Sequence, residues 1–408
     1  MSMHKTDNRL KIAYLTNEHA HDKRSLSSAL YYMGRALEQH CGEVTYLERV
    51  LSWEKRYVAR LMQEATKHIL KRRLVERRLL FIAKKQAKVA AQRIAGQQFD
   101  VIVAPDGGPD IAFLQTDIPI LLPMDLTFHL QCTTNPEFSR LLGFCARQGE
   151  MIERAAFQKA SKLLFSSHWA ARSASEDYGI EPQKVHAISW GTNLDHIPPR
   201  EQVLAKKLSG RCRLLFMSAG WQRKGGDIAY ETLLKLHEMG IEAELTVCGT
   251  TPPPGIAHEH MMVIPYLDKN DTQQASEIEK LYAMSDFLIL PTRADCVPNV
   301  LGEAYAFGVP VIIANTGGIT DVVRNGENGY VLPYEARGEA YAQVIAELCR
   351  DEQRYRQLVQ SSWATFETRL NWNVWGMTVK NILNEMLEVK GTEVRKTATR
   401  GGKGANHQ

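Results

Sequence analysis

The chain has 408 residues, which is long for a single hydrophobic core and predicts two domains. With 44% hydrophobic and 24% charged residues the composition is that of a soluble globular protein, and no apolar run approaches the roughly 18 residues of a membrane span. Seven scattered cysteines without a Cys-x-x-Cys pair argue against a disulfide framework or a zinc site, and no signal peptide is expected from the polar N-terminus. We therefore expect a cytoplasmic protein, with a peripheral position on the inner face of the membrane as an alternative; the net charge of +4 decides little.

Short apolar runs alternate with amphipathic segments in the first half of the chain, the pattern of a parallel sheet with crossover helices. Apolar residues recur at helical spacing from Leu26 to Leu37, which predicts a helix after the first strand. The predicted strands of this half are residues 12–15, 44–47, 101–103, 119–122, 163–165 and 185–188.

The stretch 55–93 is strongly basic, with thirteen Lys or Arg against two acidic residues. Its cations are interleaved with apolar residues. These cations include Arg72, Arg73, Arg77, Arg78, Lys84, Lys85 and Lys88. One interpretation is an amphipathic helix whose cations face an anionic membrane surface. Another is a solvated helix that covers the first sheet. Nucleic acid is not expected as a partner, because no recognised binding module accompanies the stretch.

The strand pattern begins again after a linker-like segment at 193–210, which contains two prolines and several charges. The second set of predicted strands is 213–217, 245–247, 263–264, 287–290, 311–314 and 330–332. We expect an α/β protein with two doubly wound, Rossmann-like domains, residues 1–195 and 196–370, that face each other across a cleft. Ligands of such sheets bind outside the carboxyl ends of the strands. A helix at 371–389 follows, and the Gly-, Lys- and Thr-rich tail 390–408 is predicted to be disordered.

The most informative motif starts at Asp295 and ends at Glu303, after the buried strand 287–290. Pro298 is expected in the first turn of a helix there, and Gly308 after its end. The unpaired N–H groups at the start of such a helix, at Asn299, Val300 and Leu301, suit a phosphate. The two carboxylates beside them suit hydroxyl groups. This combination predicts a nucleotide sugar as the ligand.

Two further loops follow buried strands of the second domain. In 218–226, Gly220 allows close backbone approach, and Arg223 and Lys224 supply the cations that a diphosphate requires. The alternative for this loop is a solvated turn before a helix. Gly317 and Gly318 form either an ordinary turn or a second set of backbone donors near the same phosphate.

The first domain gives fewer signals. Ser27 and Ser28 lie between the first strand and its helix, where they either belong to a substrate loop or cap the helix. Asp125 and His129 follow the strand at 119–122 and are candidates for the active site, although a lone histidine is more often structural. There is no Asp-x-Asp motif, no metal-ligand cluster and no P-loop, so no metal or other cofactor is predicted.

These motifs resemble the retaining GT-B glycosyltransferases, specifically the GT4 family (glycosyl transferases group 1). The likeness covers nearly the whole chain and is strongest from residue 213 to residue 333. Its Glu-x7-Glu signature implies that Glu303 binds the ribose hydroxyls of the donor, whereas Asp295 replaces the first acid, which meets the transferred sugar. Arg223 and Lys224 match the basic pair that neutralises the diphosphate.

The resemblance also shows departures. Cys296 replaces a common glycine, Ser27 and Ser28 replace a double glycine of the acceptor-side loop, and Met124 stands where a histidine is usual. The family implies base contacts from the backbone near Tyr266. It also implies that the helix at 371–389 packs back on the first domain.

The function implied is that of a retaining hexosyltransferase. It would move a sugar from a nucleotide-diphosphate donor to a carbohydrate or lipid-linked acceptor, in polysaccharide, lipopolysaccharide or glycolipid assembly. Two alternatives remain open. One is another GT-B enzyme, a sugar-nucleotide epimerase or a sugar phosphorylase. The other is a non-catalytic scaffold that binds a sugar nucleotide.

Overall fold

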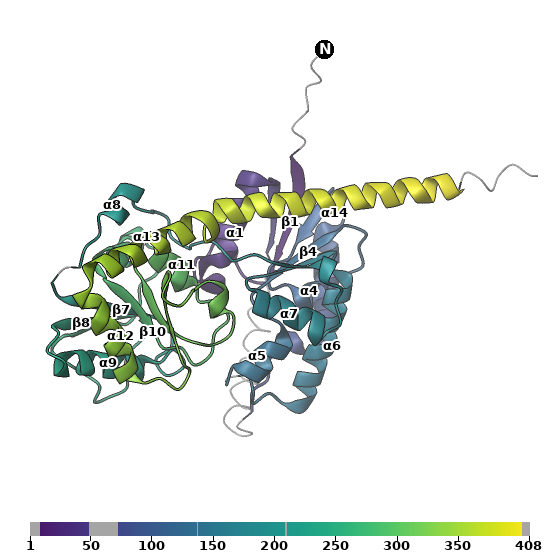
Figure 1. Cartoon of the computed structure of the whole chain (residues 1–408). Coiled ribbons are helices and arrows are strands. Elements are labelled where there is room, and N and C mark those ends of the chain that lie inside the picture. Colours follow the sequence, from purple (N-terminus) through teal and green to yellow (C-terminus); the bar gives the residue numbers. More distant parts are fainter. Residues whose placement is uncertain (1–8, 49–71, 137, 209, 402–408) are drawn as a thin grey trace, which may run out of the picture.

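A computed structural model describes residues 9–48, 72–136, 138–208 and 210–401. These residues form two parallel six-stranded sheets, each covered by helices, as Figure 1 shows. The strand orders are β2-β1-β3-β4-β5-β6 in the first sheet and β12-β11-β10-β7-β8-β9 in the second. The α/β class with two Rossmann-like units is therefore confirmed.

The first sheet comes from the N-terminal half of the chain. Its strands are β1 (Leu10–Thr16), β2 (Gly42–Glu48), β3 (Val101–Val103), β4 (Ile120–Met124), β5 (Lys162–Phe165) and β6 (Val185–Ala187). Its main helices are α1 (Ala29–His40), α3 (Leu80–Ile94), α4 (Gly108–Ile111), α5 (Phe128–Thr134), α6 (Gly143–Lys159) and α7 (His168–Glu176).

The second sheet follows the linker and the short helix α8 (Arg200–Leu204). Its strands are β7 (Cys212–Met217), β8 (Ala243–Cys248), β9 (Met261–Ile264), β10 (Phe287–Leu290), β11 (Val311–Ala314) and β12 (Gly329–Leu332). The helices that cover it are α9 (Gly226–Glu238), α10 (Thr272–Met284), α11 (Asn299–Ala306), α12 (Gly338–Arg350) and α13 (Glu352–Arg369).

Both faces of the first sheet are buried because helices pack on each side, and alternate residues of each strand point to opposite faces. On β1, Ala13 and Leu15 join the core under α3 and α6, whereas Ile12 and Tyr14 join the core under α1 and the last helix. Such two-sided burial explains why these strands are short, continuous apolar runs in the sequence.

The last helix, α14 (Trp372–Gly401), leaves the second domain and runs across the first, where Figure 1 shows it in yellow along α1. Trp375, Val379 and Leu383 are buried with Met33 and Leu37 of the first domain. The helix extends past the predicted boundary at 389 up to Gly401, so the prediction of a disordered segment from 390 is wrong for this part. Half of the residues 390–401 are Lys, Arg, Glu or Ala, which favour a helix, and the segment contains no proline. Residues 402–408 lie outside the described residues.

The predicted basic helix also needs correction. Residues 55–71 lie outside the described residues, and the rest of the stretch forms a single 3-10 turn, Glu76–Arg78, followed by α3. Arg78 is buried, with an Nη1–Oε2 distance of 2.6 Å to Glu153, and Arg77 reaches Asp106 and Asp110 at 3.3 Å. Arg77 and Arg78 therefore face carboxylates inside the domain and do not face outward. None of the helices in the described ranges has an apolar stretch long enough to cross a bilayer.

Candidate functional site

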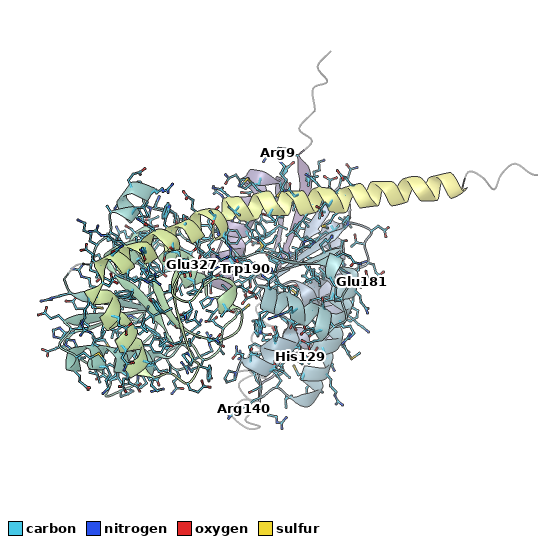
Figure 2. The ribbon with its side chains drawn as sticks, viewed as in Figure 1. Arg9, His129, Arg140, Glu181, Trp190 and Glu327 are labelled. Carbon is cyan, nitrogen blue, oxygen red and sulfur yellow. The ribbon has the colours of Figure 1, made fainter. Side chains whose placement is uncertain are left out.

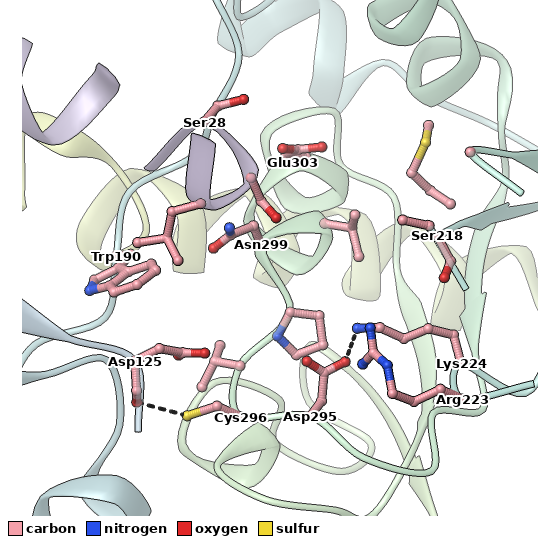
Figure 3. Close-up of a pocket in the computed structure, with 18 of the residues that line it drawn as sticks. Ser28, Asp125, Trp190, Ser218, Arg223, Lys224, Asp295, Cys296, Asn299 and Glu303 are labelled. Atoms are coloured by element: carbon pink, nitrogen blue, oxygen red, sulfur yellow. Dashed lines mark hydrogen bonds and ion pairs between the residues drawn. The ribbon is translucent and has the colours of Figure 1, made fainter. Parts of the chain in front are cut away.

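A cavity of about 550 Å³ lies between the two sheets, next to the carboxyl ends of strands from both domains (Figure 3). The second domain supplies most of its charged groups: Arg223, Lys224, Lys269, Asp295 and Glu303. Its further wall residues include Ser218, Tyr266, Asn299 and Val300. The first domain contributes Ser27, Ser28, Asp125 and Trp190. The structure thus brings together predicted residues that are far apart in the sequence.

The start of α11 borders this cavity. Strand β10 is fully buried and delivers the chain to a loop, after which Pro298 takes the N-cap position with φ −62° and ψ 128°. The helix therefore begins one residue later than expected, at Asn299. The N–H of Leu301 donates to the Pro298 carbonyl at 3.0 Å, and its side chain is buried in the core. Leu301 is therefore not placed to contact a phosphate, and Asn299 and Val300 remain as wall residues.

The basic pair of the loop after β7 lies at one end of the cavity. Lys224 forms an ion pair with Asp295, and both side chains are mostly buried. Thr292 Oγ1 lies 3.3 Å from the same carboxylate, and Arg223 Nη1 donates to the Ala294 carbonyl at 2.9 Å. The loop after β7 is thus held against the loop before α11. This arrangement places two cations and one carboxylate beside the start of α11.

Glu303 lies deeper in the cavity, and its carboxylate side chain is only 3% exposed. Its Oε1 accepts from Lys269 Nζ at 2.6 Å, and its Oε2 accepts from the Tyr282 hydroxyl at 2.8 Å. Burial raises the pKa of Tyr282, and the Glu303 charge raises it further, so this phenol stays protonated as a donor. Lys269 was not predicted, because it lies in the loop after β9 with no motif around it.

Asp125 brings a carboxylate from the first domain to the opposite wall, immediately after β4. Its Oδ1 accepts from Ser166 Oγ at 2.8 Å, and the Cys296 thiol of the second domain donates to its carbonyl at 3.1 Å (Figure 3). Burial raises the pKa of Asp125 from 3.8 to about 6, and the Asp295 charge adds to this although Ser166 opposes it. Burial also raises the pKa of Cys296, so its sulfur stays a thiol.

The acceptor-side loop has an unusual backbone. Leu26, Ser27 and Ser28 have positive φ values of 45°, 53° and 73°, a region that side chains other than glycine rarely adopt. Ser28 Oγ donates to the Lys23 carbonyl at 2.5 Å inside the loop. The loop therefore keeps a conformation suited to glycine although no glycine is present.

Other predicted residues lie outside the cavity. His129 is on α5, where its ring is 43% exposed and faces Glu150 and Asp177 at 4.0 and 3.8 Å (Figure 2). Thr127 caps the start of this helix, and His129 is not among the residues that line the cavity, so the structure does not place it in the candidate site. The Gly220 N–H donates to Ser218 Oγ at 3.0 Å, and this glycine is not among the residues that line the cavity.

Gly317 and Gly318 support the site from behind. Gly317 has φ +55°, and a Cβ there would meet the Asp295 carbonyl oxygen at 2.0 Å. The Gly318 N–H donates to the Cys296 carbonyl at 3.0 Å. These glycines therefore pack against the backbone of the Asp295 loop and do not line the cavity. Within the described ranges, no three His, Cys, Asp or Glu side chains are placed to hold a metal ion.

Comparison with known proteins finds a family whose profile matches most of the second domain. The profile of the family described as Glycosyl transferases group 1 matches residues 211–351. The D-inositol 3-phosphate glycosyltransferase of Thermomonospora curvata is 25% identical over 57% of this chain and 58% of its own length. The chain thus spans little more than half the length of the curated relatives it matches. These findings confirm the predicted resemblance to GT4-like glycosyltransferases.

Solved structures show the same fold over almost the whole chain. Sucrose-phosphate synthase from Thermosynechococcus elongatus superposes with a TM-score of 0.70, with 16% identity over 93% of this chain and all of the other. Anabaena Alr3699/HepE, solved with UDP-glucose, gives 0.59, with 15% identity over the same shares. Together with the two parallel sheets, these likenesses confirm the GT-B fold.

Proposed function

We propose that this chain, whose residues 211–351 match the group 1 glycosyltransferases, moves a sugar from a nucleotide-diphosphate donor to an acceptor hydroxyl. The observation that carries the proposal is the shared cavity of Lys224, Asp295 and Glu303 beside the start of α11. The UDP-glucose complex of the structurally similar HepE supports a nucleotide sugar as donor. Donor consumption that requires an added acceptor separates transfer from epimerisation, and donor binding without turnover would mark a non-catalytic scaffold.

The proposed chemistry is stabilisation of the leaving group. Negative charge builds on the β-phosphate as the bond to the sugar breaks, and Lys224, Arg223 and the start of α11 would meet that charge. Lys224 would have to exchange part of its contact with Asp295 for the phosphate. Asp295 is then left to accept from hydroxyls of the transferred sugar.

The nucleoside would occupy the other end of the cavity. Glu303 would accept from the ribose hydroxyls, beside Lys269 and Tyr282 that already hold its carboxylate. Tyr266, which lines the same wall and is 59% exposed, would lie next to the base. No metal is needed in this scheme, because side-chain cations take the role of neutralising the diphosphate.

We further propose retention of the anomeric configuration. In this mechanism the departing phosphate takes the proton of the acceptor hydroxyl on the same face of the sugar. Asp125 faces that region from the first domain, and it would position the sugar by hydrogen bonds rather than attack it. Closure of the two domains would exclude water and limit hydrolysis of the donor.

The acceptor is proposed to be a carbohydrate or a lipid-linked sugar. The outward face of α3 supports a surface-associated acceptor, because it presents Phe81, Lys84, Lys85 and Lys88, all exposed, at positions i, i+3, i+4 and i+7. Such a stripe of cations with one aromatic residue suits an anionic membrane surface. The peripheral location is part of this proposal.

A thermal-shift screen with UDP-, GDP- and ADP-sugars tests the donor first, because a ligand that binds the folded state raises the melting temperature. Lys224→Ala and Glu303→Ala are then compared with wild type for donor binding and for transfer to an acceptor. Each substitution is expected to cost about 2–4 kcal/mol of transition-state stabilisation. Lys280→Ala, on the exposed side of α10, is the control and keeps wild-type rates. Wild-type rates in both site variants contradict the proposal.

A further inference from the structure

Asn193 is the first residue of the linker, it is fully buried, and it contacts three separate parts of the molecule. Its side-chain amide Nδ2 donates to the Ser27 carbonyl at 2.9 Å, on the acceptor-side loop of the first domain. Its Oδ1 accepts from Trp372 Nε1 at 3.1 Å, at the start of α14. Its backbone carbonyl accepts from Lys269 Nζ at 3.0 Å. One residue thus joins the loop, the crossover helix and the second domain.

The loop that Asn193 contacts has a backbone that costs free energy to maintain. Leu26, Ser27 and Ser28 are three consecutive non-glycine residues with positive φ. Such conformations persist only where surrounding structure enforces them, and they cluster at functional sites. The hydrogen bond from Asn193 reaches the middle residue of the three from outside the loop. It is therefore well placed to hold the loop in this conformation.

The contact with Lys269 places Asn193 next to the end of the cavity where the nucleotide sugar is proposed to bind. The same ammonium group donates to Glu303 Oε1 at 2.6 Å and to the Asn193 carbonyl at 3.0 Å. Ser27 and Glu303 both line the cavity, although they belong to different domains. The chain of contacts Ser27–Asn193–Lys269–Glu303 therefore fixes the acceptor-side loop relative to the expected ribose site.

We propose that Asn193 is a positioning residue: it holds the Leu26–Ser28 loop in its left-handed conformation and in register with the donor half of the cavity. This inference rests on the proposed transfer reaction. Asn193 itself does not touch the reacting atoms in this scheme. Glycines would adopt this backbone conformation without strain. In this loop, which has none, the hydrogen bond from Asn193 stabilises the conformation instead.

The test is Asn193→Asp, which keeps the size of the side chain and an acceptor for Trp372 but loses the donor to Ser27. Hydrogen–deuterium exchange of peptides covering residues 22–30 is expected to increase, because the loop relaxes. The turnover number is expected to fall about tenfold, as for one buried hydrogen bond that becomes a repulsive contact. The dissociation constant of UDP, or of whichever of UDP, GDP and ADP binds, is expected to stay within about threefold, since Lys224 and Glu303 are unchanged.

A second substitution separates positioning from general damage. Ser27→Gly lowers the cost of the positive φ, so the loop should depend less on Asn193 in this background. Asn193→Asp is therefore expected to lower turnover much less in Ser27→Gly than in wild type, a non-additivity that marks coupled residues. An equal loss in both backgrounds overturns the proposal, as does unchanged hydrogen exchange in the loop.

Controls keep the result interpretable. Asn328→Asp places a carboxylate at an equally buried asparagine, bonded to the Val322 carbonyl and Thr365 far from the cavity. It should lower the melting temperature without changing exchange in residues 22–30. If Asn193→Asp does not fold, Trp372→Phe takes its place. It removes the donor to Asn193 Oδ1 without adding charge, and it should increase hydrogen exchange in residues 22–30. Absence of nucleotide binding in the wild type would refute the proposed function, whereas the exchange measurements would still test Asn193.

Discussion

The cations of the loops that border the cavity in the second domain and those just before α3 in the first domain have opposite roles, although both are clusters of basic residues in the sequence. In the second domain, Arg223, Lys224 and Lys269 lie on loops at the carboxyl ends of strands and line the cavity. In the first domain, Arg77 and Arg78 turn inward to buried carboxylates. The difference teaches that a cation indicates a binding site when it lies in a loop at the carboxyl end of a sheet strand. A basic run within a helical stretch carries no such information until its partners are known.

The largest expected effect tests the inward half of this comparison. Arg78→Met leaves Glu153, which has 0% side-chain exposure, as an unpaired buried charge. We expect the free energy of unfolding to fall by about 3–5 kcal/mol, measured by urea denaturation at neutral pH. Arg72→Met, at an exposed neighbouring position, is the matched control and should change stability little. A loss below about 1 kcal/mol would show that Arg78 is not buried against Glu153.

The double variant Arg78→Met with Glu153→Gln sharpens the result. A neutral amide at 153 removes the uncompensated charge, and its oxygen still accepts from the Phe128 N–H, which now donates to Glu153 at 2.9 Å. Part of the lost stability should therefore return. A double variant no more stable than Arg78→Met would assign the loss to packing on the Phe128 ring instead, 4.4 Å from the guanidinium.

The carboxylate on the first-domain wall gives the next effect, and it depends on pH. The pKa of Asp125 is raised from 3.8 to about 6, chiefly by burial, so the folded state disfavours its ionised form. The stability that this group contributes is present below pH 4 and is lost as pH rises through 6. A shift of about 2 units corresponds to at most about 3 kcal/mol, and less because the side chain is partly exposed to the cavity.

Asp125→Asn should therefore stabilise the protein at pH 8 and have almost no effect at pH 4. Ser166 Oγ can still donate to the amide oxygen, so the local hydrogen bond is kept. Melting temperatures of both proteins across this pH range provide the measurement. An equal effect at both pH values would mean that the carboxyl group has an ordinary pKa. Transfer activity should fall at pH 8 if the ionised carboxylate orients the sugar.

Much of the fold follows from the sequence. Residues 101–103, 287–290 and 311–314 were predicted as strands with the bounds that the structure shows, because both faces of these strands are buried and the runs are uniformly apolar. Of the candidate site, several residues that line the cavity as predicted lie in the loops that follow buried strands. Lys224, Asp295 and Asp125 are examples.

The remaining features depend on contacts between distant segments. Asn193 and Lys269 come together only because the linker contacts the loop after β9, and no local sequence pattern predicts this contact. The sequence makes His129 either a site residue or a structural one, and in the structure its ring is 43% exposed and does not line the cavity. The sequence leaves Gly317 as either an ordinary turn residue or a backbone donor to the phosphate, whereas in the structure its lack of a Cβ admits the Asp295 carbonyl.

That close approach makes Gly317→Ala the third prediction. The positive φ alone should cost about 1–3 kcal/mol of stability, and the contact with the Asp295 carbonyl should also displace the Asp295 loop. Gly240→Ala is the matched control: its φ is also positive, at +74°, but no atom lies within 4 Å of the added Cβ. Both variants should lose stability, and only Gly317→Ala should lose donor binding and turnover. Equal activity in the two variants would separate Gly317 from the site.

The smallest effect concerns the outward face of the first domain. Phe81 is 66% exposed, and Lys84, Lys85 and Lys88 lie on the same side of α3, opposite the buried Ala83, Ala87 and Ala90. This face is distinct from Arg77 and Arg78, which cannot reach lipid while they hold their internal carboxylates. If α3 contacts an anionic membrane, each lysine contributes about 1 kcal/mol or less, and added salt weakens the contact.

Vesicles of phosphatidylcholine with an anionic phospholipid measure this contact by co-sedimentation. Replacing Lys84, Lys85 and Lys88 by alanine should weaken binding about tenfold to a hundredfold, because the three contributions act together. Replacing Lys207, Lys235 and Lys280 of the second domain removes the same charge from other surfaces and should weaken it less. Equal losses in the two triple variants would attribute binding to net charge. Loss confined to the α3 variant would show that the first domain also has a cationic binding surface. That surface would be the outward face of α3, which follows the inward-facing Arg77 and Arg78 in the chain.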